Sequence, residues 1–194
     1  MKKIGTKTIV VLAVIAVIVI WAISSYNGLV SKEEGVSTAW AQVENVYQRR
    51  ADLIPNLVAT VKGYAEHEKS TFEAVVAARA NATGIKVESL SEEELAKFQQ
   101  AQDALSQSLG RLIAISEAYP DLKASENFKD LQAQLEGTEN RITVERNKFN
   151  EVAKVYNTSI RKFPTNIFAS IFGFEKKGYF AAAPGAETAP KVEF

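Results

Sequence analysis

The N-terminal part of the chain is an unbroken run of apolar residues. The run extends from Ile9 to Ile23, and no charged residue occurs at positions 8–31. A helix rises about 1.5 Å per residue, so residues 8–26 would span about 28 Å, close to the roughly 30 Å of a bilayer's hydrocarbon core. The pattern therefore predicts a transmembrane anchor at residues 8–27, through which the chain would contact the lipid bilayer.

The charges that flank this run predict its orientation. Lys2, Lys3 and Lys7 precede it, whereas only Lys32 lies in the first turns after it. Because basic flanks stay in the cytoplasm, we expect residues 1–7 inside the cell and the rest of the chain as an extracytoplasmic domain on the inner membrane. A cleaved signal peptide is the alternative, since lysines precede the run and a weak small-residue cleavage site ends it.

Helical periodicity dominates the rest of the chain, beginning with a seam of three- and four-residue spacings typical of a coiled coil. The seam stays in phase across Pro55, which removes a backbone hydrogen bond and bends a helix. We therefore expect one long, bent helix to about Ala80, with a break at Leu53–Ile54 as the alternative. The seam consists of Val36, Trp40, Val43, Tyr47, Arg50, Ile54, Leu57, Val61, Tyr64 and Glu68.

Two further helices are predicted after a loop at residues 81–90. Ser91 and Glu94 form a capping box, in which each side chain can bond a free backbone N–H at a helix start. Tyr119–Pro120 ends this helix, and Ser125 begins the next, which runs to about Ile160. The predicted fold is all-α: a transmembrane helix that continues into an antiparallel up-down-up bundle of three long helices at residues 28–161.

A short aromatic helix and an extended tail are expected at residues 162–194. The helix would cover residues 165–174, after Phe163–Pro164 ends the third long helix. Lys176 and Lys177 follow it, so it could dock on protein or lie in the membrane interface. The residues expected to make that contact are Phe163, Ile167, Phe168, Ile171 and Phe172.

The composition of the chain limits the binding partners and catalytic sites that it can have. Basic and acidic residues both number 23, so the formal net charge is 0; a nucleic-acid binder needs a basic excess, and we expect no nucleic-acid partner. The chain has no Cys and one His, His67, which excludes thiolate sites and His-only metal clusters. It contains neither of the common glycine-rich phosphate-binding motifs. We expect no enzyme activity, cofactor, metal or small-molecule substrate.

Polar residues interrupt the apolar seams at several positions. We interpret them as register-setting residues, with a buried functional pocket as the alternative; they are Arg50, Glu68, Gln102, Ser116, Thr138 and Glu145. A second stripe follows the same spacing on the opposite face of the first helix. It is either a solvated face or a lateral contact between copies or with a partner, and it consists of Gln42, Asn45, Arg49, Asp52 and Asn56.

A bundle of three helices would leave the start of the first helix uncovered. Aligning the predicted turns places the far end of the second helix near Arg50, so residues 28–50 would form a membrane-proximal stalk of about 33 Å. The chain's own tail would leave the bundle at the opposite end. We therefore expect neighbouring copies to cover the exposed apolar stripe on the stalk, which consists of Val36, Trp40, Val43 and Tyr47.

Several motifs resemble the LemA family over Tyr26 to Phe194. They include Ala39-Trp40-x-Gln42-Val43, Gln48-Arg49-Arg50-x-Asp52-Leu53-Ile54-Pro55-Asn56-Leu57-Val58, Val61-Lys62-Gly63-Tyr64-Ala65, Ala78-Arg79-Ala80, Thr138-Glu139-Asn140-Arg141-Ile142, Tyr156-Asn157 and Pro190-Lys191-Val192-Glu193-Phe194. The resemblance implies a single-pass bacterial membrane protein with an antiparallel helical bundle and no agreed catalytic activity. It also implies that one relative is a magnetosome protein associated with building internal membranes, and that genes of the family often lie beside genes for membrane proteases.

Together these patterns favour a non-enzymatic, membrane-anchored scaffold that self-assembles and organises or remodels the bacterial membrane. A homo-oligomer is expected. The alternative is an adaptor for an envelope protease or signalling system, which would act as a monomer or small oligomer and bind an envelope protein partner. Particle size distinguishes the two, because a scaffold should form large, ordered particles.

Overall fold

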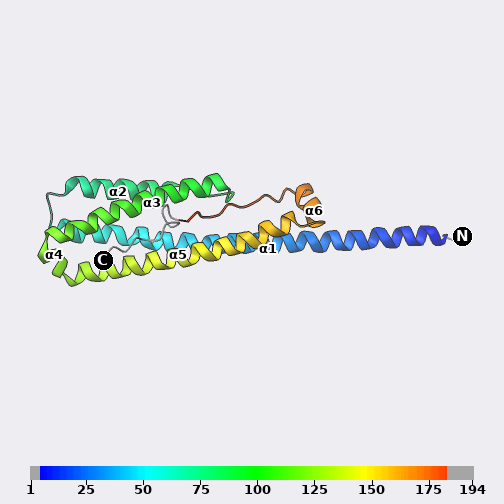
Figure 1. The fold of residues 1–194 in the computed structure, drawn as a ribbon, viewed down its shortest axis with the longest axis horizontal. Coiled ribbons are helices and arrows are strands. Elements are labelled where there is room, and N and C mark those ends of the chain that lie inside the picture. The colour runs from blue at the N-terminus through cyan, green and yellow to red at the C-terminus, as the bar shows by residue number, and fades with distance from the viewer. Residues whose placement is uncertain (1–4, 183–194) are drawn as a thin grey trace, which may run out of the picture.

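The fold is all-helical in the computed structural model, which describes residues 5–182. Four long helices make up the body of the molecule, with shorter helical segments between the third and the fourth of them and after the fourth (Figure 1). In chain order the elements are α1 (Thr6–Lys62), α2 (Lys69–Gly84), α3 (Glu92–Ile115), η1 (Ser116–Ala118), α4 (Pro120–Ala124), α5 (Glu126–Arg161) and α6 (Thr165–Ile171).

Helix α1 is one continuous element of 57 residues, about 86 Å long. It includes the apolar run, whose side chains at positions 9–20 are exposed, and a stretch long and apolar enough to cross a membrane. This apolar helix suggests membrane anchoring. Pro55 lies inside α1 without ending it, which confirms that the helix continues through the proline.

The predicted extension of the first helix to Ala80 is wrong. α1 ends at Lys62, Gly63 caps it, and the chain turns at residues 63–68 before α2 begins. The turn lets α2 fold back so that Phe72 and Val75 join the same apolar core as Val61. The predicted seam does not continue through the turn, where Ala65 is the buried residue. Tyr64, a predicted seam residue, is 46% exposed.

The predicted all-α bundle of long helices with a short C-terminal helix is confirmed. It has four long helices and not three in up-down-up order, because α2 is separate from α1. α1 packs along α5, and α2 packs along α3. α1 and α5 run in opposite directions, because Arg50 contacts Glu139 while Trp40, ten residues earlier, contacts Phe149, ten residues later. In Figure 1 the two pairs lie one above the other, and α6 sits beside α1 at the end nearest the apolar run.

Two clusters of buried apolar side chains fill the bundle. A proximal core, nearer the apolar run, contains Trp40, Phe98, Phe149 and Phe180. A distal core lies toward the turns at residues 63–68 and 116–125 and includes Ile54. Most residues of the predicted seam contribute to one core or the other, so the periodicity correctly identified which side of α1 is buried.

The chain after α6 returns along the bundle. Gly178 passes so close to the start of α3 that an added Cβ would lie 2.8 Å from the Cα of Glu92, and its N–H donates to the carbonyl of Leu90 at 2.8 Å. Phe180 is then buried in the proximal core. The tail thus docks on its own chain as far as Ala181, and residues 183–194 lie outside the described part of the structure.

Candidate interaction surfaces

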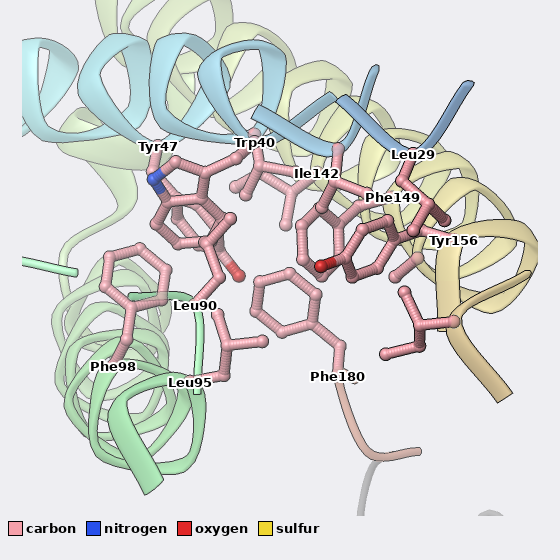
Figure 2. Packing of buried hydrophobic residues seen from close by; sticks show 14 of the residues in the cluster. Leu29, Trp40, Tyr47, Leu90, Leu95, Phe98, Ile142, Phe149, Tyr156 and Phe180 are labelled. Atoms are coloured by element: carbon pink, nitrogen blue, oxygen red, sulfur yellow. The ribbon is translucent and has the colours of Figure 1, made fainter. Parts of the chain in front are cut away.

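The apolar stripe expected on a bare stalk is buried inside the bundle. Val36 and Val43 are fully buried, and Trp40 and Tyr47 are each only 6% exposed. Figure 2 shows Trp40 among aromatic side chains of α3, α5 and the tail. Its ring centroid lies 5.2 Å from that of Phe98 on α3 and 5.8 Å from that of Phe149 on α5. These four residues cannot form a contact between copies while the bundle is folded.

The direction of α5 explains why this stripe is buried. The extra helix α2 reverses the chain once more than expected, so α5 runs antiparallel to α1 and ends near the apolar run. Residues 28–50 are therefore paired with α5 and do not form a stalk. The tail also starts at this end, which is why Phe180 reaches Trp40, with the two rings stacked at 6.1 Å.

A buried polar network separates the two cores. Arg50 is 1% exposed, and its Nη1 donates to the carboxylate of Glu139 at 2.7 Å and to the hydroxyl of Ser106 at 2.9 Å. Its Nη2 donates to the side-chain oxygen of Gln102, whose amide Nε2 in turn donates to the carbonyl of Ala82 at 3.4 Å. The network joins all four long helices at one level, which favours the register-setting interpretation.

The other polar seam positions have simpler surroundings. Thr138 and Ser116 are buried, and the Thr138 hydroxyl donates to the carbonyl of Gln134 at 2.8 Å on its own helix. Glu68 and Glu145 are only partly buried, and Glu145 forms an ion pair with Lys148 at 2.8 Å. Of the six predicted positions, only Arg50 and Gln102 come together.

The second stripe on α1 lies on the outside of the bundle, as predicted. All five of its side chains are exposed; they are Gln42, Asn45, Arg49, Asp52 and Asn56. Three of them, together with Arg141 on α5, line a shallow groove of about 440 Å³ between α1 and α5. We call these five residues the polar stripe. Asp52 accepts a hydrogen bond from Gln48 at 2.7 Å.

The predicted contact residues around α6 divide into two sets. Phe168 packs against Trp21 with ring centroids 5.0 Å apart, and Phe172 against Tyr26 at 4.9 Å, so α6 docks on α1 where the apolar run ends. The other residues of the set, Phe163, Ile167 and Ile171, point away from the protein and are 80%, 48% and 68% exposed.

The comparisons with known proteins decide the family. A model of the LemA family matches residues 39–194. The chain belongs to the LemA family. It is similar to the magnetosome protein MamQ of Magnetospirillum gryphiswaldense, 31% identical over 182 residues that cover 84% of this chain and 67% of that protein. It is also 29% identical to magnetosome protein MamQ 2 of Paramagnetospirillum magneticum, over 96% of this chain and 78% of that protein. It is 24% identical to Protein LemA of Metamycoplasma hominis, over 81% of this chain and 69% of that protein.

Three amide side chains hold the tail, and the pattern of hydrophobic positions did not identify them. Asn157 both donates to and accepts from the backbone of Lys177, and Asn150 does the same with Phe180, at 2.8–3.0 Å. Gln99 on α3 makes the equivalent pair with Ala181. The seven-residue spacing of the two asparagines was the available signal.

Burial also shifts two phenols in the proximal core of this LemA-family protein. Burial raises the pKa of Tyr47, although the nearby guanidinium groups of Arg146 and Arg50 oppose the shift. Burial raises the pKa of Tyr156 as well, and the carboxylate of Glu33 adds to that effect. Both phenols are therefore neutral at physiological pH, as expected of side chains that serve packing. Within residues 5–182, no group of three His, Cys, Asp or Glu side chains is arranged to hold a metal ion.

Proposed function

We propose that this LemA-family protein is a non-enzymatic scaffold of the bacterial inner membrane, anchored through α1, whose copies contact one another laterally. The observation that carries the proposal is the continuity of α1, which contains both the apolar run and the exposed polar stripe. A single helix holds the stripe at fixed heights above the membrane in every copy. The likeness to proteins named as magnetosome proteins supports a role in organising membranes.

The chemistry of the polar stripe suits contact between copies of the same orientation. Copies anchored in one membrane stand parallel, so each residue of the stripe meets the same residue of a neighbour around a twofold axis. Arg49 and Asp52 are three residues apart, about 4.5 Å along the helix. Arg49 of each copy therefore lies within reach of Asp52 of the other, which gives two reciprocal ion pairs.

The amides of the stripe add to this complementarity. Asn45 and Asn56 each carry donor and acceptor atoms, so either residue can pair with its own counterpart. The side chains are individually weak partners in water. Anchoring in the same membrane raises the effective concentration of the copies, which offsets the weakness of each contact.

Single-cysteine crosslinking tests this contact directly, because the chain has no native Cys. In membranes that contain full-length protein, Asn45→Cys should form disulfide-linked dimers on oxidation. Gln100→Cys is the matched control: it is an exposed amide on α3, at a similar height, because its neighbours Phe98 and Gln102 contact Tyr47 and Arg50. The control should stay monomeric under the same conditions.

The outcomes separate the scaffold from its alternative. Crosslinked dimers at Asn45 support the contact between copies. Because a twofold contact closes at the dimer, large particles of the full-length protein in detergent would require a second contact between dimers and would support the scaffold. Equal crosslinking at both positions, or none at either, contradicts the stripe as the contact. Capture of one different envelope protein at Asn45, with small particles in detergent, would favour the adaptor instead.

A further inference from the structure

The short helix α6 lies beside the end of the apolar run. Phe168 contacts Trp21, and Phe172 and Phe174 both contact Tyr26, with ring centroids 4.9 and 5.7 Å away. Trp and Tyr are enriched where a membrane span meets water. The contacts hold α6 at this boundary, although α6 is about 140 residues away from Tyr26 in the sequence.

The height of α6 follows from these contacts. If residues 8–27 cross the bilayer, Trp21 lies about 9 Å on the membrane side of the last residue of the span. Phe168, which touches Trp21, therefore lies below the level at which α1 leaves the membrane. Interfacial helices bury their apolar faces by about 5–10 Å, so the depth of α6 matches that of a helix lying in the interface.

Large apolar side chains on α6 and just before and after it are turned away from the protein. Phe163, Ile167 and Ile171 follow one another at intervals of four residues and are 80%, 48% and 68% exposed. Phe172, which touches Tyr26 on one side, is still 52% exposed. Four large apolar side chains are thus exposed within ten residues, and such a concentration of exposed apolar side chains marks a contact with a partner or a membrane.

Basic residues flank this patch on both sides. Arg161 and Lys162 precede it, Lys176 and Lys177 follow it, and Glu175 is the one acidic residue between positions 161 and 177. Lys177 already pairs with Glu33 at 2.9 Å, whereas Arg161 and Lys162 are exposed. An apolar face with basic flanks is complementary to a bilayer that contains anionic lipid.

We propose that α6 and its flanks are a second membrane contact of this chain. The exposed faces of Phe163, Ile167, Ile171 and Phe172 insert into the interface of the bilayer that α1 crosses. Arg161 and Lys162 lie among the headgroups of anionic phospholipids. The proposal rests on α1 spanning the membrane and holds whether or not copies associate through the polar stripe.

The consequence is a fixed orientation of the bundle. A single helix leaves a domain free to tilt and rotate about the point where it enters the membrane. A second contact beside the span restricts both motions, so the α1–α5 face that carries the polar stripe stays upright on the membrane surface. Membrane contact by α6 thus orients the surface through which copies would meet.

Spin labels on single cysteines of the full-length protein, in vesicles of phosphatidylcholine and phosphatidylglycerol, test this placement. A nitroxide at Ile171→Cys should be accessible to oxygen, which partitions into lipid, and protected from a water-soluble nickel complex. The matched control is Val144→Cys, an aliphatic side chain on α5 with 49% exposure, about 27 Å further from the membrane. Its label should be more accessible to nickel than to oxygen, so its oxygen-to-nickel accessibility ratio should be severalfold lower than that of the Ile171 label.

Three results would overturn the proposal, each in a distinguishable way. A label at Ile171 that is as accessible to nickel as the Val144 label would place α6 in water. Protection from both oxygen and nickel would place it under a neighbouring protein copy. A label at Ile15→Cys that resides in water would show that α1 does not span the membrane, which is the premise of the proposal. If the Ile15 label is exposed to lipid but the Ile171 label gives either of the first two results, only the membrane contact by α6 is rejected.

The role of the basic residues that flank α6 can be tested separately. Arg161→Gln combined with Lys162→Gln should lower the oxygen-to-nickel ratio at Ile171 in vesicles with phosphatidylglycerol. The substitutions should leave the ratio unchanged in vesicles of phosphatidylcholine alone. An equal loss in both lipids would contradict the role assigned to anionic headgroups.

Discussion

Arg50 shows how one charged residue can occupy a coiled-coil seam. Its guanidinium is buried, yet each of its terminal nitrogens has a partner from α3 or α5. The partner carboxylate of Glu139 is different, because its side chain remains 41% exposed. The two members of the pair therefore depend on each other unequally: Glu139 can be solvated without Arg50, whereas Arg50 cannot be solvated without leaving the core.

This asymmetry predicts which substitution costs more. Glu139→Ala leaves a buried cation without its anion and should lower the free energy of unfolding by about 3 kcal/mol. Arg50→Met fills the site with an apolar chain and chiefly leaves the buried oxygen of Gln102 unpaired, at about 1 kcal/mol. Urea titration of the full chain in detergent, followed by circular dichroism, measures both values.

The double variant provides the control for this prediction. Arg50→Met with Glu139→Ala should be about as stable as Arg50→Met alone, because the uncompensated charge is then absent. If Arg50→Met proves more costly than Glu139→Ala, the guanidinium is not held chiefly by this carboxylate, and the unequal dependence is wrong.

At the scale of elements, Pro55 links α1 to α2. A proline has no backbone N–H, so the carbonyl four residues earlier, that of Ala51, has no helical partner. The Nε of Arg79 on α2 donates to this carbonyl at 2.8 Å. The proline that was expected only to bend the helix thus also provides an acceptor for the neighbouring helix.

A double-mutant cycle tests this link. Arg79→Met alone should lower the free energy of unfolding by about 1.5 kcal/mol, since it removes a charge-assisted hydrogen bond. Pro55→Ala should keep the fold, change the bend of α1 and supply a new N–H for Ala51. In that background Arg79→Met should cost less, with a coupling energy of about 1 kcal/mol.

Arg111→Met, at an exposed position on α3, is the matched control for this cycle. Its effect should be the same with proline or alanine at position 55. Additive effects of Arg79→Met and Pro55→Ala would show that the carbonyl of Ala51 gains nothing from the new N–H.

The elements also show what could be predicted from the sequence. Periodicity identified the buried side of α1, α3 and α5, because burial depends on spacing along one helix, and the capping residue Ser91 marked the start of α3. It did not locate the turn at residues 63–68, because Tyr64 continues the apolar spacing in the sequence although its side chain is 46% exposed in the structure. Of the candidate surfaces, the outward polar stripe was predicted correctly, whereas the amides that bind the tail were not found.

At the scale of the whole molecule, the turn at residues 63–68 changes the predicted direction of α5 and the place where the tail begins. An additional reversal of the chain changes α5 from parallel to antiparallel with respect to α1. The end of α5, and with it α6 and the tail, therefore lies beside the apolar run and not at the far end of the bundle. Spacing patterns report which face of a helix is buried, but the direction of each helix depends on the number of turns before it.

The same arrangement makes the topology of the molecule testable. The apolar run and the bundle share one helix, so the whole bundle must lie on the side of the membrane where α1 emerges. Lys2, Lys3 and Lys7 precede the run, and basic residues favour the cytoplasmic side. The bundle is therefore expected outside the cytoplasm, with the α1–α2 turn about 53 Å beyond residue 27 along α1.

Two single-cysteine variants at opposite ends of α1 check this orientation. His67 is exposed in the α1–α2 turn, and Gly5 is exposed just before α1 begins. In spheroplasts, a membrane-impermeant maleimide should label His67→Cys at once and label Gly5→Cys only after the membrane is permeabilised. The reverse pattern would place the bundle, the polar stripe and α6 on the cytoplasmic face. Labelling of both variants before permeabilisation would show that α1 does not cross the membrane, because an intact bilayer between the two positions must protect one of them.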